Sequence, residues 1–403
     1  MAKKIDNETI DVHTLSDKEK QKLISKAWDI LDAGNSEASM LCDALSNINS
    51  YEDTGCYVLN ALMSGKFKDG GFPEGRTTIL GAPSSVGKSY IGLRAAAIAQ
   101  KKGKTILIFD SENAIDNSFA TNLGLDVTKV KYFPVRSIEQ CKNNMFAFLD
   151  FVQKNKLKGQ FFILVDSLAG MMSELDFKRL EKESDSADMG TRAKAMRAFI
   201  QMMNTMSAAT KTTIVCTNHV YENPGAMYPP LEKSMPGGLA VKYFASTVMQ
   251  LSARQIKEDD TKVKTGDKAA IGSKGMTGII IRGISVKNRV VRPYMEAEMY
   301  LSWEKGLRKY YGLLDLALKF GVLYNKMGKI YIPSKTEGVE DEFVGNRTKA
   351  ETDKALWERM MPVLEEKIQE EWCYNVNNVD DGDDEEEESE SLFEEELETS
   401  EDI

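Results

Sequence analysis

Residues 81–89 read Gly-Ala-Pro-Ser-Ser-Val-Gly-Lys-Ser, and they stand between a short β-rich run, 77–80, and a helix-forming stretch that begins at Tyr90. A strand, a glycine-bearing loop and a helix in this order are the context of a Walker A phosphate-binding loop. Its backbone N–H groups surround phosphate oxygens, its lysine reaches the β- and γ-phosphates, and its last hydroxyl ligates Mg²⁺. Ala82 replaces the first glycine of the strict pattern. The expected nucleotide contacts are Ala82, Pro83, Ser84, Ser85, Val86, Gly87, Lys88 and Ser89, with Ser89 also a metal ligand.

Short apolar runs alternate with amphipathic stretches along the middle of the chain. Alternating strands and helices form a mostly parallel sheet that is covered on both faces. We therefore predict an α/β fold with a P-loop NTPase core and small N-terminal and C-terminal accessory segments. Ligands of such sheets bind at the carboxyl ends of the strands, so the polar residues that follow each run mark the candidate site. The runs are 77–80, 105–109, 161–165, 212–216, 246–251 and 278–286.

The chain divides into four expected regions. A helical segment that we interpret as an oligomerisation element, 1–72, precedes the core, 73–325; an accessory region, 326–379, and an acidic tail, 380–403, follow it. The tail holds 15 acidic residues and no Lys or Arg, so the rest of the chain has 52 basic and 47 acidic residues, a net charge of +5. Like charges with few apolar groups cannot offset their ordering entropy, which predicts a disordered tail. It is either a solubility device or an anionic competitor for a nucleic-acid-binding surface on the same protein.

Composition narrows the class of protein. The 403 residues are 42% hydrophobic, enough for a full α/β core. No apolar run approaches the ~18 residues of a membrane span and the charged start has no signal-peptide pattern, so we expect a soluble, cytoplasmic protein without a membrane partner. The absence of a C-x-x-C pair predicts reduced, mostly buried thiols at Cys42, Cys56, Cys141, Cys216 and Cys373.

Two acidic residues follow the second and third runs. Asp166 stands where a Walker B aspartate holds Mg²⁺ through water, although a strand-end acid is often only a cap or a solvated group. Glu112 is our candidate for the base that orients or deprotonates the attacking water, and we expect it beside the P-loop strand. The alternative for Glu112 is an N-cap or first-turn acid of a helix over 113–123.

Several stretches, in the right order, resemble the RecA family. They include Phe109-Asp-Ser-Glu-Asn-Ala-Ile-Asp116, Cys216-Thr-Asn-His219, Pro236-Gly-Gly-Leu-Ala-Val-Lys-Tyr-Phe-Ala-Ser246 and Val286-Lys-Asn-Arg289. In detail the sequence is most similar to those of the UvsX recombinases of tailed phages. Two stretches that carry this similarity are Asp188-Met-Gly-Thr-Arg-Ala-Lys-Ala-Met196 and Asn218-His-Val-Tyr-Glu222. The resemblance covers residues 75–324 and implies a RecA-like core that uses ATP and Mg²⁺.

The resemblance also implies roles for single residues. Glu112 falls on the family's catalytic glutamate, and Asp116 and Phe119 fall beside the adenine. His219 falls on the phosphate-sensing position, where an imidazole N–H can donate to the γ-phosphate and shift when it leaves. Outside the resemblance, a lone histidine is more often structural.

Lys287 and Arg289 alternate with their neighbours, which places them on one face of a strand. They are either a solvated edge or, as in RecA-like filaments, a pair that reaches the γ-phosphate of a neighbouring subunit.

Two irregular stretches follow the third and fourth strands, about 180–190 and 220–238, and the resemblance implies two DNA-binding loops there. Aromatic and apolar side chains can stack on unstacked bases, and cations can hold phosphates. The expected contacts are Tyr221, Met227 and Tyr228 for bases, and Arg192, Lys194, Arg197 and Lys233 for phosphates.

The resemblance implies an ATP-dependent recombinase that forms helical filaments on single-stranded DNA and pairs it with homologous duplex DNA. It also implies a phage single-strand-binding protein and a recombination mediator as partners, in the cytoplasm of an infected bacterial host. A hexameric DNA helicase shares the nucleotide motifs and is the main alternative. A RecA-fold regulatory ATPase, whose hydrolysis would be indifferent to DNA, is a third.

Overall fold

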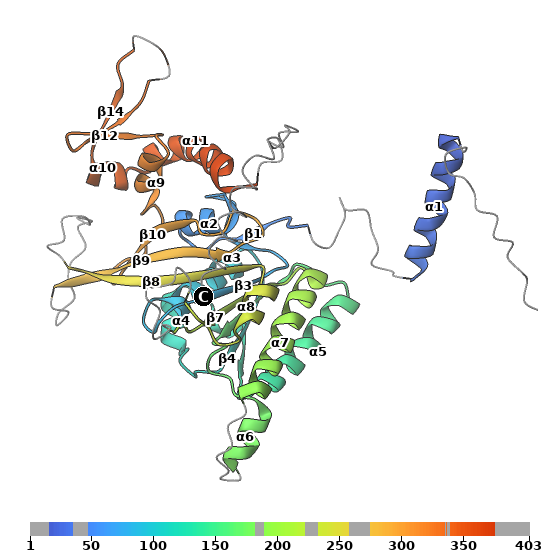
Figure 1. The fold of residues 1–403 in the computed structure, drawn as a ribbon. Coiled ribbons are helices and arrows are strands. Elements are labelled where there is room, and N and C mark those ends of the chain that lie inside the picture. Colours follow the sequence, from blue (N-terminus) through green and yellow to red (C-terminus); the bar gives the residue numbers. More distant parts are fainter. Residues whose placement is uncertain are drawn as a thin grey trace, which may run out of the picture.

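A computed structural model describes residues 16–34, 47–181, 189–221, 233–257, 275–334, 336 and 339–374. Within these ranges the largest sheet has nine strands in the order β11-β10-β9-β8-β3-β7-β6-β4-β5 (Figure 1). The expected tail and residues 182–188 and 222–232 lie outside the described ranges.

The central sheet is mostly parallel, as predicted. Its parallel strands are β3 (Thr77–Gly81), β4 (Thr105–Asp110), β5 (Val130–Pro134), β6 (Phe161–Asp166), β7 (Thr213–Asn218) and β8 (Thr247–Lys257). An antiparallel extension consists of β9 (Met276–Lys287), β10 (Glu296–Ser302) and β11 (Gly306–Leu307).

One expected neighbour relation is wrong. We predicted that the strand before Glu112 adjoins the P-loop strand, but β7 and β6 lie between β3 and β4. Sequence spacing does not fix strand order, because each crossover helix lets the chain skip positions in the sheet.

Helices cover both faces of the sheet because successive strand residues point to opposite sides. On one face Leu80 packs with α3 (Lys88–Lys101), and on the other Ile79 packs with α5 (Ile138–Lys154) and α7 (Met189–Thr210). Four short helices connect the strands: α4 (Asn117–Asn122), η3 (Val127–Lys129), α6 (Glu174–Glu181) and α8 (Leu239–Phe244).

The segment before the P-loop strand belongs to the same core. Every residue of α2 (Tyr57–Ser64) is buried, and β1 (Tyr51–Glu52) pairs with β2 (Phe72–Pro73). Packing therefore continues across the expected boundary between residues 72 and 73.

The C-terminal region closes over α2, and Figure 1 shows it in orange and red. Trp357 and Trp372 of α11 (Lys354–Trp372) belong to the same apolar cluster as α2, and the Phe67 N–H donates to the Glu365 carboxylate at 2.8 Å. This region also contains α9 (Leu313–Lys319), β12 (Tyr324–Lys326), β13 (Lys329–Ile332), β14 (Glu342–Asn346) and α10 (Arg347–Thr352). Since β12 spans the expected boundary at 325, the core and the accessory region share this strand.

Helix α1 (Asp17–Gly34) carries exposed apolar side chains at Leu23, Ile24, Trp28 and Ile30. Among the described residues, no helix combines the length and apolarity needed to cross a bilayer.

A shielded ion-pair cluster ties the N-terminal segment to the sheet. The Lys104 Nζ contacts Glu52 at 3.1 Å and Glu74 at 2.6 Å, and it donates to the Gly159 carbonyl at 2.5 Å. The side chains of Lys104 and Glu52 are only 14% and 3% exposed, so water screens them little.

Lys104→Met should therefore lower the free energy of unfolding by about 3–5 kcal/mol, because it leaves buried carboxylates without a partner. The matched control is Lys154→Met, which removes an ion pair to Asp150 from a lysine that is 72% exposed. That change should cost less than about 1 kcal/mol. Urea denaturation of both variants checks the expectation, and equal losses would contradict it.

Candidate nucleotide-binding site

The P-loop joins β3 to α3 as predicted. Gly87 has φ 97°, a left-handed conformation that favours glycine, and a Cβ there would lie 3.1 Å from Leu301 Cδ2. The glycine therefore lets the loop pass close to β10 while α3 begins at Lys88.

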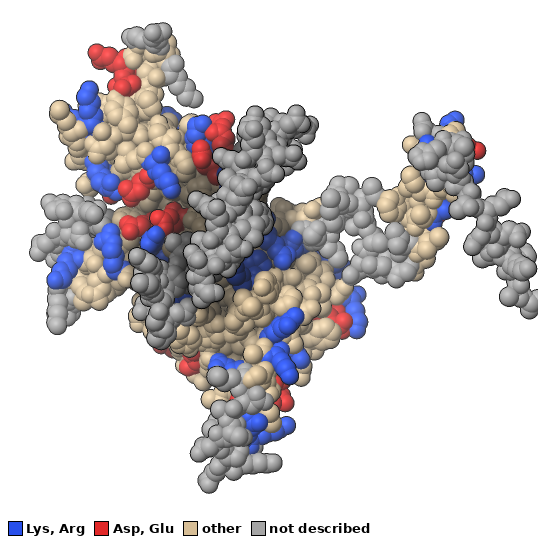
Figure 2. Space-filling view, in the orientation of Figure 1, with Lys and Arg blue, Asp and Glu red and all other residues tan. Residues whose placement is uncertain are grey.

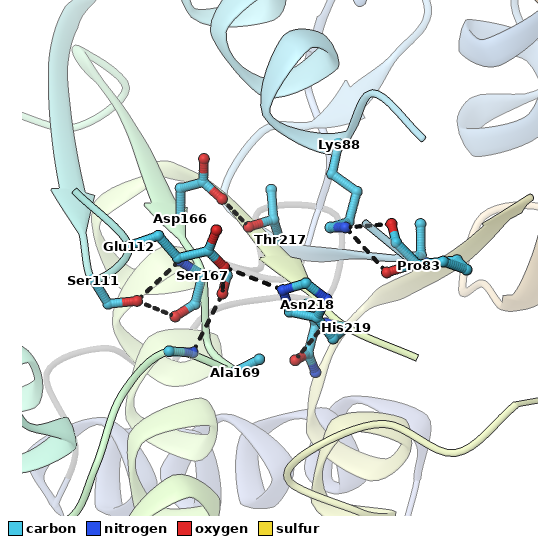
Figure 3. Close-up of polar contacts among 12 residues, drawn as sticks. Pro83, Lys88, Ser111, Glu112, Asp166, Ser167, Ala169, Thr217, Asn218 and His219 are labelled. Carbon is cyan, nitrogen blue, oxygen red and sulfur yellow. Dashed lines mark hydrogen bonds and ion pairs between the residues drawn. The ribbon is translucent and has the colours of Figure 1, made fainter. Parts of the chain in front are cut away.

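Lys88 points into this loop. Its Nζ donates to the carbonyls of Ala82 at 3.0 Å and Pro83 at 2.8 Å (Figure 3). Burial lowers the pKa of the Lys88 ammonium, and the nearby Glu112 and Asp166 carboxylates oppose that shift. A buried cation that can exchange two neutral carbonyls for phosphate oxygens fits the role predicted for it.

Asp166 ends β6 and is almost fully buried. Its Oδ1 accepts a hydrogen bond from the Thr217 hydroxyl, whereas none of the described residues donates a hydrogen bond to its buried Oδ2. Burial raises the pKa of the Asp166 carboxyl, and the neighbouring Thr217 and Ser89 hydroxyls oppose the rise. A partnerless carboxylate oxygen near the P-loop serine suits a hard cation with oxygen ligands, so Ser89 and Asp166 fit Mg²⁺.

Glu112 lies at the same end of the sheet as Lys88 and Asp166, beyond the carboxyl ends of the strands, although β7 and β6 separate β4 from the P-loop strand β3. Its Oε1 accepts a hydrogen bond from the Ser167 hydroxyl and lies 3.2 Å from His219 Nε2 (Figure 3). The side chains of His219 and Glu112 are 27% and 35% exposed, which leaves both open to a ligand. This arrangement joins three strand ends: β4 supplies the candidate base, β6 holds it, and β7 supplies the histidine.

Asp110 fixes the backbone that carries Glu112. It is fully buried, and its Oδ1 accepts from the N–H groups of Glu112 and Asn113, both at 2.8 Å. Its Oδ2 accepts from the Ile115 N–H at 3.3 Å and the Tyr132 hydroxyl at 3.2 Å. Because the Asp110 carboxylate accepts the hydrogen bonds of the N–H groups in this turn, Glu112 is not a helix cap.

Asp116 is the N-cap of α4, whose Phe119 N–H donates to the Asp116 carboxylate at 2.6 Å. Helix α4 is therefore shorter than the predicted 113–123, since the cap residue starts it at Asn117. Phe119 lines the cavity next to the P-loop, and Asp116 caps the helix that carries it.

A cavity of about 490 Å³ lies between the P-loop and the antiparallel strands. Its walls combine predicted residues with others that local patterns did not reveal. The predicted ones are Ser84, Ser85, Gly87, Lys88, Ser89, Glu112, Phe119, Asp166 and His219; the others are Tyr90, Gln255, Ile279, Leu301 and Trp303.

Lys287 and Arg289 do not line this cavity. Strand β9 ends at Lys287, so Arg289 lies beyond it, and the predicted alternation on one strand face does not extend to Arg289. The Lys287 Nζ donates to the carbonyls of Lys242 and Tyr243 near the end of α8. Burial, with the charges of Arg289 and Lys242, lowers the pKa of Lys287 to about 8.

The expected DNA contacts gather where α7 begins and where the second irregular stretch starts and ends. Arg192 donates to the Ala169 carbonyl at 2.8 Å, and with Pro236 and Gly237 it lines a hollow of about 180 Å³. Lys194 is exposed, and the Arg197 guanidinium lies 5.7 Å from the Phe244 ring centroid.

Tyr221 and Lys233 lie at the two ends of the second stretch. Tyr221 is exposed, and its N–H donates to Ser234 at 2.8 Å. The backbone of Lys233 is held by the Gln250 side chain. Met227 and Tyr228 lie outside the described residues.

A comparison with protein families identifies the fold. Residues 37–308 match the model of the RecA N-terminal domain. The chain belongs to the RecA family. This match starts ahead of the P-loop strand, in agreement with the packing of α2 into the core.

Individual RecA proteins match over similar lengths. The RecA of Chlorobium chlorochromatii is 29% identical over 295 residues, which is 73% of this chain and 74% of that protein. The RecA of Mycoplasmopsis pulmonis is 30% identical over 274 residues, 68% of this chain and 73% of its own. The RecA of Ruminococcus albus is 27% identical over 326 residues, 80% of this chain and 75% of its own. RecA-family proteins are DNA-dependent ATPases of recombination and repair that bind single-stranded DNA as filaments.

Proposed function

We propose that this RecA-family chain is an ATP-dependent recombinase that assembles on single-stranded DNA and catalyses homologous pairing and strand exchange. The observation that carries the proposal is the 3.2 Å contact between Glu112 Oε1 and His219 Nε2. It links the candidate catalytic base to His219, which follows β7 and directly precedes the second expected DNA-binding stretch.

The residues divide the chemistry of ATP hydrolysis among them. Lys88 and the P-loop N–H groups hold the phosphates, and Ser89 and Asp166 hold Mg²⁺, which neutralises phosphate charge when bound. Glu112, oriented by Ser167 and by the Asp110 turn, positions the attacking water and accepts its proton. His219 exchanges its contact with Glu112 for one with the γ-phosphate, so the position of β7's end reports the nucleotide state.

Lys287 and Arg289 act on the nucleotide of a neighbouring subunit. Their place outside the chain's own cavity supports this role, because a cation that stabilises the transition state must reach a γ-phosphate. Hydrolysis then requires assembly. The exposed apolar side chains of α1 supply a second element of self-assembly between subunits.

The charge of Lys287 gives a pH test of this role. In the single chain Lys287 has a pKa of about 8 and loses its proton as pH rises from 7 to 9, so a growing fraction of subunits has no Lys287 cation to bring to a neighbour's site. DNA-stimulated ATPase activity should therefore decline across this range. Lys287→Arg should abolish the decline, because a guanidinium stays charged. ATPase rates measured from pH 7 to 9 check this, and identical pH profiles for the two proteins would contradict a charged role.

DNA binds across the start of α7 and the ends of the second stretch. Lys194 and Arg197 are exposed there for phosphates, and Tyr221 offers a ring for a base. Sequence choice is left to base pairing between the bound strand and the incoming duplex.

The finer assignment is to the UvsX type of tailed phages, and the motifs at 188–196 and 218–222 support it. Such a recombinase works in the cytoplasm of an infected bacterium, in recombination, repair and recombination-dependent replication. Its partners are a phage single-strand-binding protein and a recombination mediator.

The alternative is a hexameric DNA helicase with the same nucleotide motifs. A strand-exchange assay separates the two functions: linear duplex and homologous circular single strands are incubated with protein and ATP. We expect joint molecules and nicked circles only when the strands are homologous. Unwinding of a forked duplex without homology, and no joint molecules, would favour the helicase.

A further inference from the structure

The three-stranded sheet of the C-terminal region has one buried and one outward face. Ile330 and Val344 lie on the buried face and belong to the main apolar cluster. The register pairs Tyr324 with Tyr331, Tyr331 with Phe343, and Lys326 with Lys329. Because side chains alternate along strands, these five residues share the opposite face.

Three aromatic rings form a ladder across this outward face. The rings of Tyr324 and Tyr331 are stacked at 5.4 Å with an interplanar angle of 16°, and the ring of Phe343 follows at 5.4 Å from Tyr331. Phe343 is 56% exposed, although aromatic rings usually bury most of their surface. The apolar core of this region is on the other face, so stability alone does not require three rings here.

Two lysines on this face can contact an anionic ligand. The side chains of Lys326 and Lys329 are exposed, and the Lys329 Nζ lies 5.8 Å from the Phe343 ring centroid. At the edge of the face the Asp341 carboxylate accepts a hydrogen bond from the Tyr324 hydroxyl and lies within the electrostatic reach of Lys326. Figure 2 shows charges of both signs over the C-terminal region, so the surface is not merely a basic patch.

We propose that the outward face of β12–β13–β14 binds unpaired bases of a second single-stranded DNA segment, with the rings stacking on bases and the two lysines contacting phosphates. Aromatic side chains on an exposed sheet face, flanked by cations, are a recognised means of holding single-stranded nucleic acid. The site lies outside the nucleotide cavity and the two irregular stretches. This proposal rests on the proposed function only for the identity of the ligand, single-stranded DNA.

The experiment uses full-length protein assembled on unlabelled oligo(dC) with a non-hydrolysable ATP analogue. Fluorescence anisotropy then measures the affinity for labelled oligo(dT), which cannot pair with the first strand. Phe343→Leu, which keeps an apolar side chain without the π face, should weaken this affinity about tenfold. Phe343→Trp should retain the affinity, and oligo(dT) should quench its additional tryptophan emission.

The matched control is Phe151→Leu, which removes a ring that is 57% exposed on α5. It should not change the affinity. Lys329→Gln leaves all three rings in place and should weaken binding in a salt-dependent manner, so a folding defect of Phe343→Leu would not mask the result.

Unchanged oligo(dT) affinity in both Phe343→Leu and Lys329→Gln would overturn the proposal. So would an equal loss of affinity for a duplex probe, which would make the face a duplex-binding surface. Failure of the proposed function is a separate result: no ATP-dependent assembly on oligo(dC) would form. In that case oligo(dT) binding to the unassembled variants still tests the face.

Discussion

Lys88→Ala protein should bind ATP at least about a hundredfold more weakly than the unchanged protein and should show no DNA-stimulated hydrolysis. Lys88 is a buried ammonium inside the P-loop, held 2.8–3.0 Å from two carbonyl oxygens that phosphate oxygens can replace. A charge-assisted hydrogen bond contributes about 1.5–3 kcal/mol, and the loss of Coulomb attraction to a polyanion adds to it. Equilibrium binding of a fluorescent ATP analogue measures the effect.

The matched control for Lys88→Ala is Lys101→Ala at the other end of α3, where the side chain is exposed. Its nucleotide affinity should be unchanged. ATP affinity of Lys88→Ala within a factor of about two of the unchanged protein would remove the P-loop from the account.

Glu112→Gln protein should keep its ATP affinity while hydrolysis slows by about 10²–10⁴-fold, the usual contribution of a positioned general base. The amide oxygen of glutamine can still accept the hydrogen bond from Ser167, so the geometry at the ends of β4 and β6 is retained. The amide cannot accept a proton from water. We expect loss of the γ-phosphate, sensed by His219 next to the second DNA-binding stretch, to weaken the grip on DNA, so the variant should also stay longer on single-stranded DNA.

Single-turnover hydrolysis and dissociation from labelled oligo(dT) test these two expectations separately. The control is Glu358→Gln on α11. It changes an exposed glutamate that is far in sequence from the residues lining the cavity. Normal turnover by Glu112→Gln would remove Glu112 from the chemistry, and a loss of ATP binding would make its role structural.

Local patterns predicted the elements that carry the site. The P-loop and the strand end at Asp166 follow from short runs in which periodicity and glycine position are informative. The expected places of His219 and Phe119 came instead from the resemblance to the RecA family. The P-loop and the strand end are local features because strand alternation and the φ of Gly87 depend on few neighbours. The expected α/β class was confirmed for the same reason.

Long-range pairings were not predictable in this way. The prediction that β4 adjoins β3 was wrong, because crossover connections of similar length can lead to different positions in the sheet. The partners of the reactive carboxylates, Ser167 for Glu112 and Thr217 for Asp166, lie 55 and 51 residues away in sequence. Trp303 reaches the cavity from beyond β10, which no pattern around residue 81 indicates.

The most direct test of the central claim is electron microscopy of the protein with long single-stranded DNA and a non-hydrolysable ATP analogue. The account predicts continuous helical filaments along the DNA, and none with Lys88→Ala protein. Closed rings on the DNA, or filaments that form equally well without nucleotide, would contradict it.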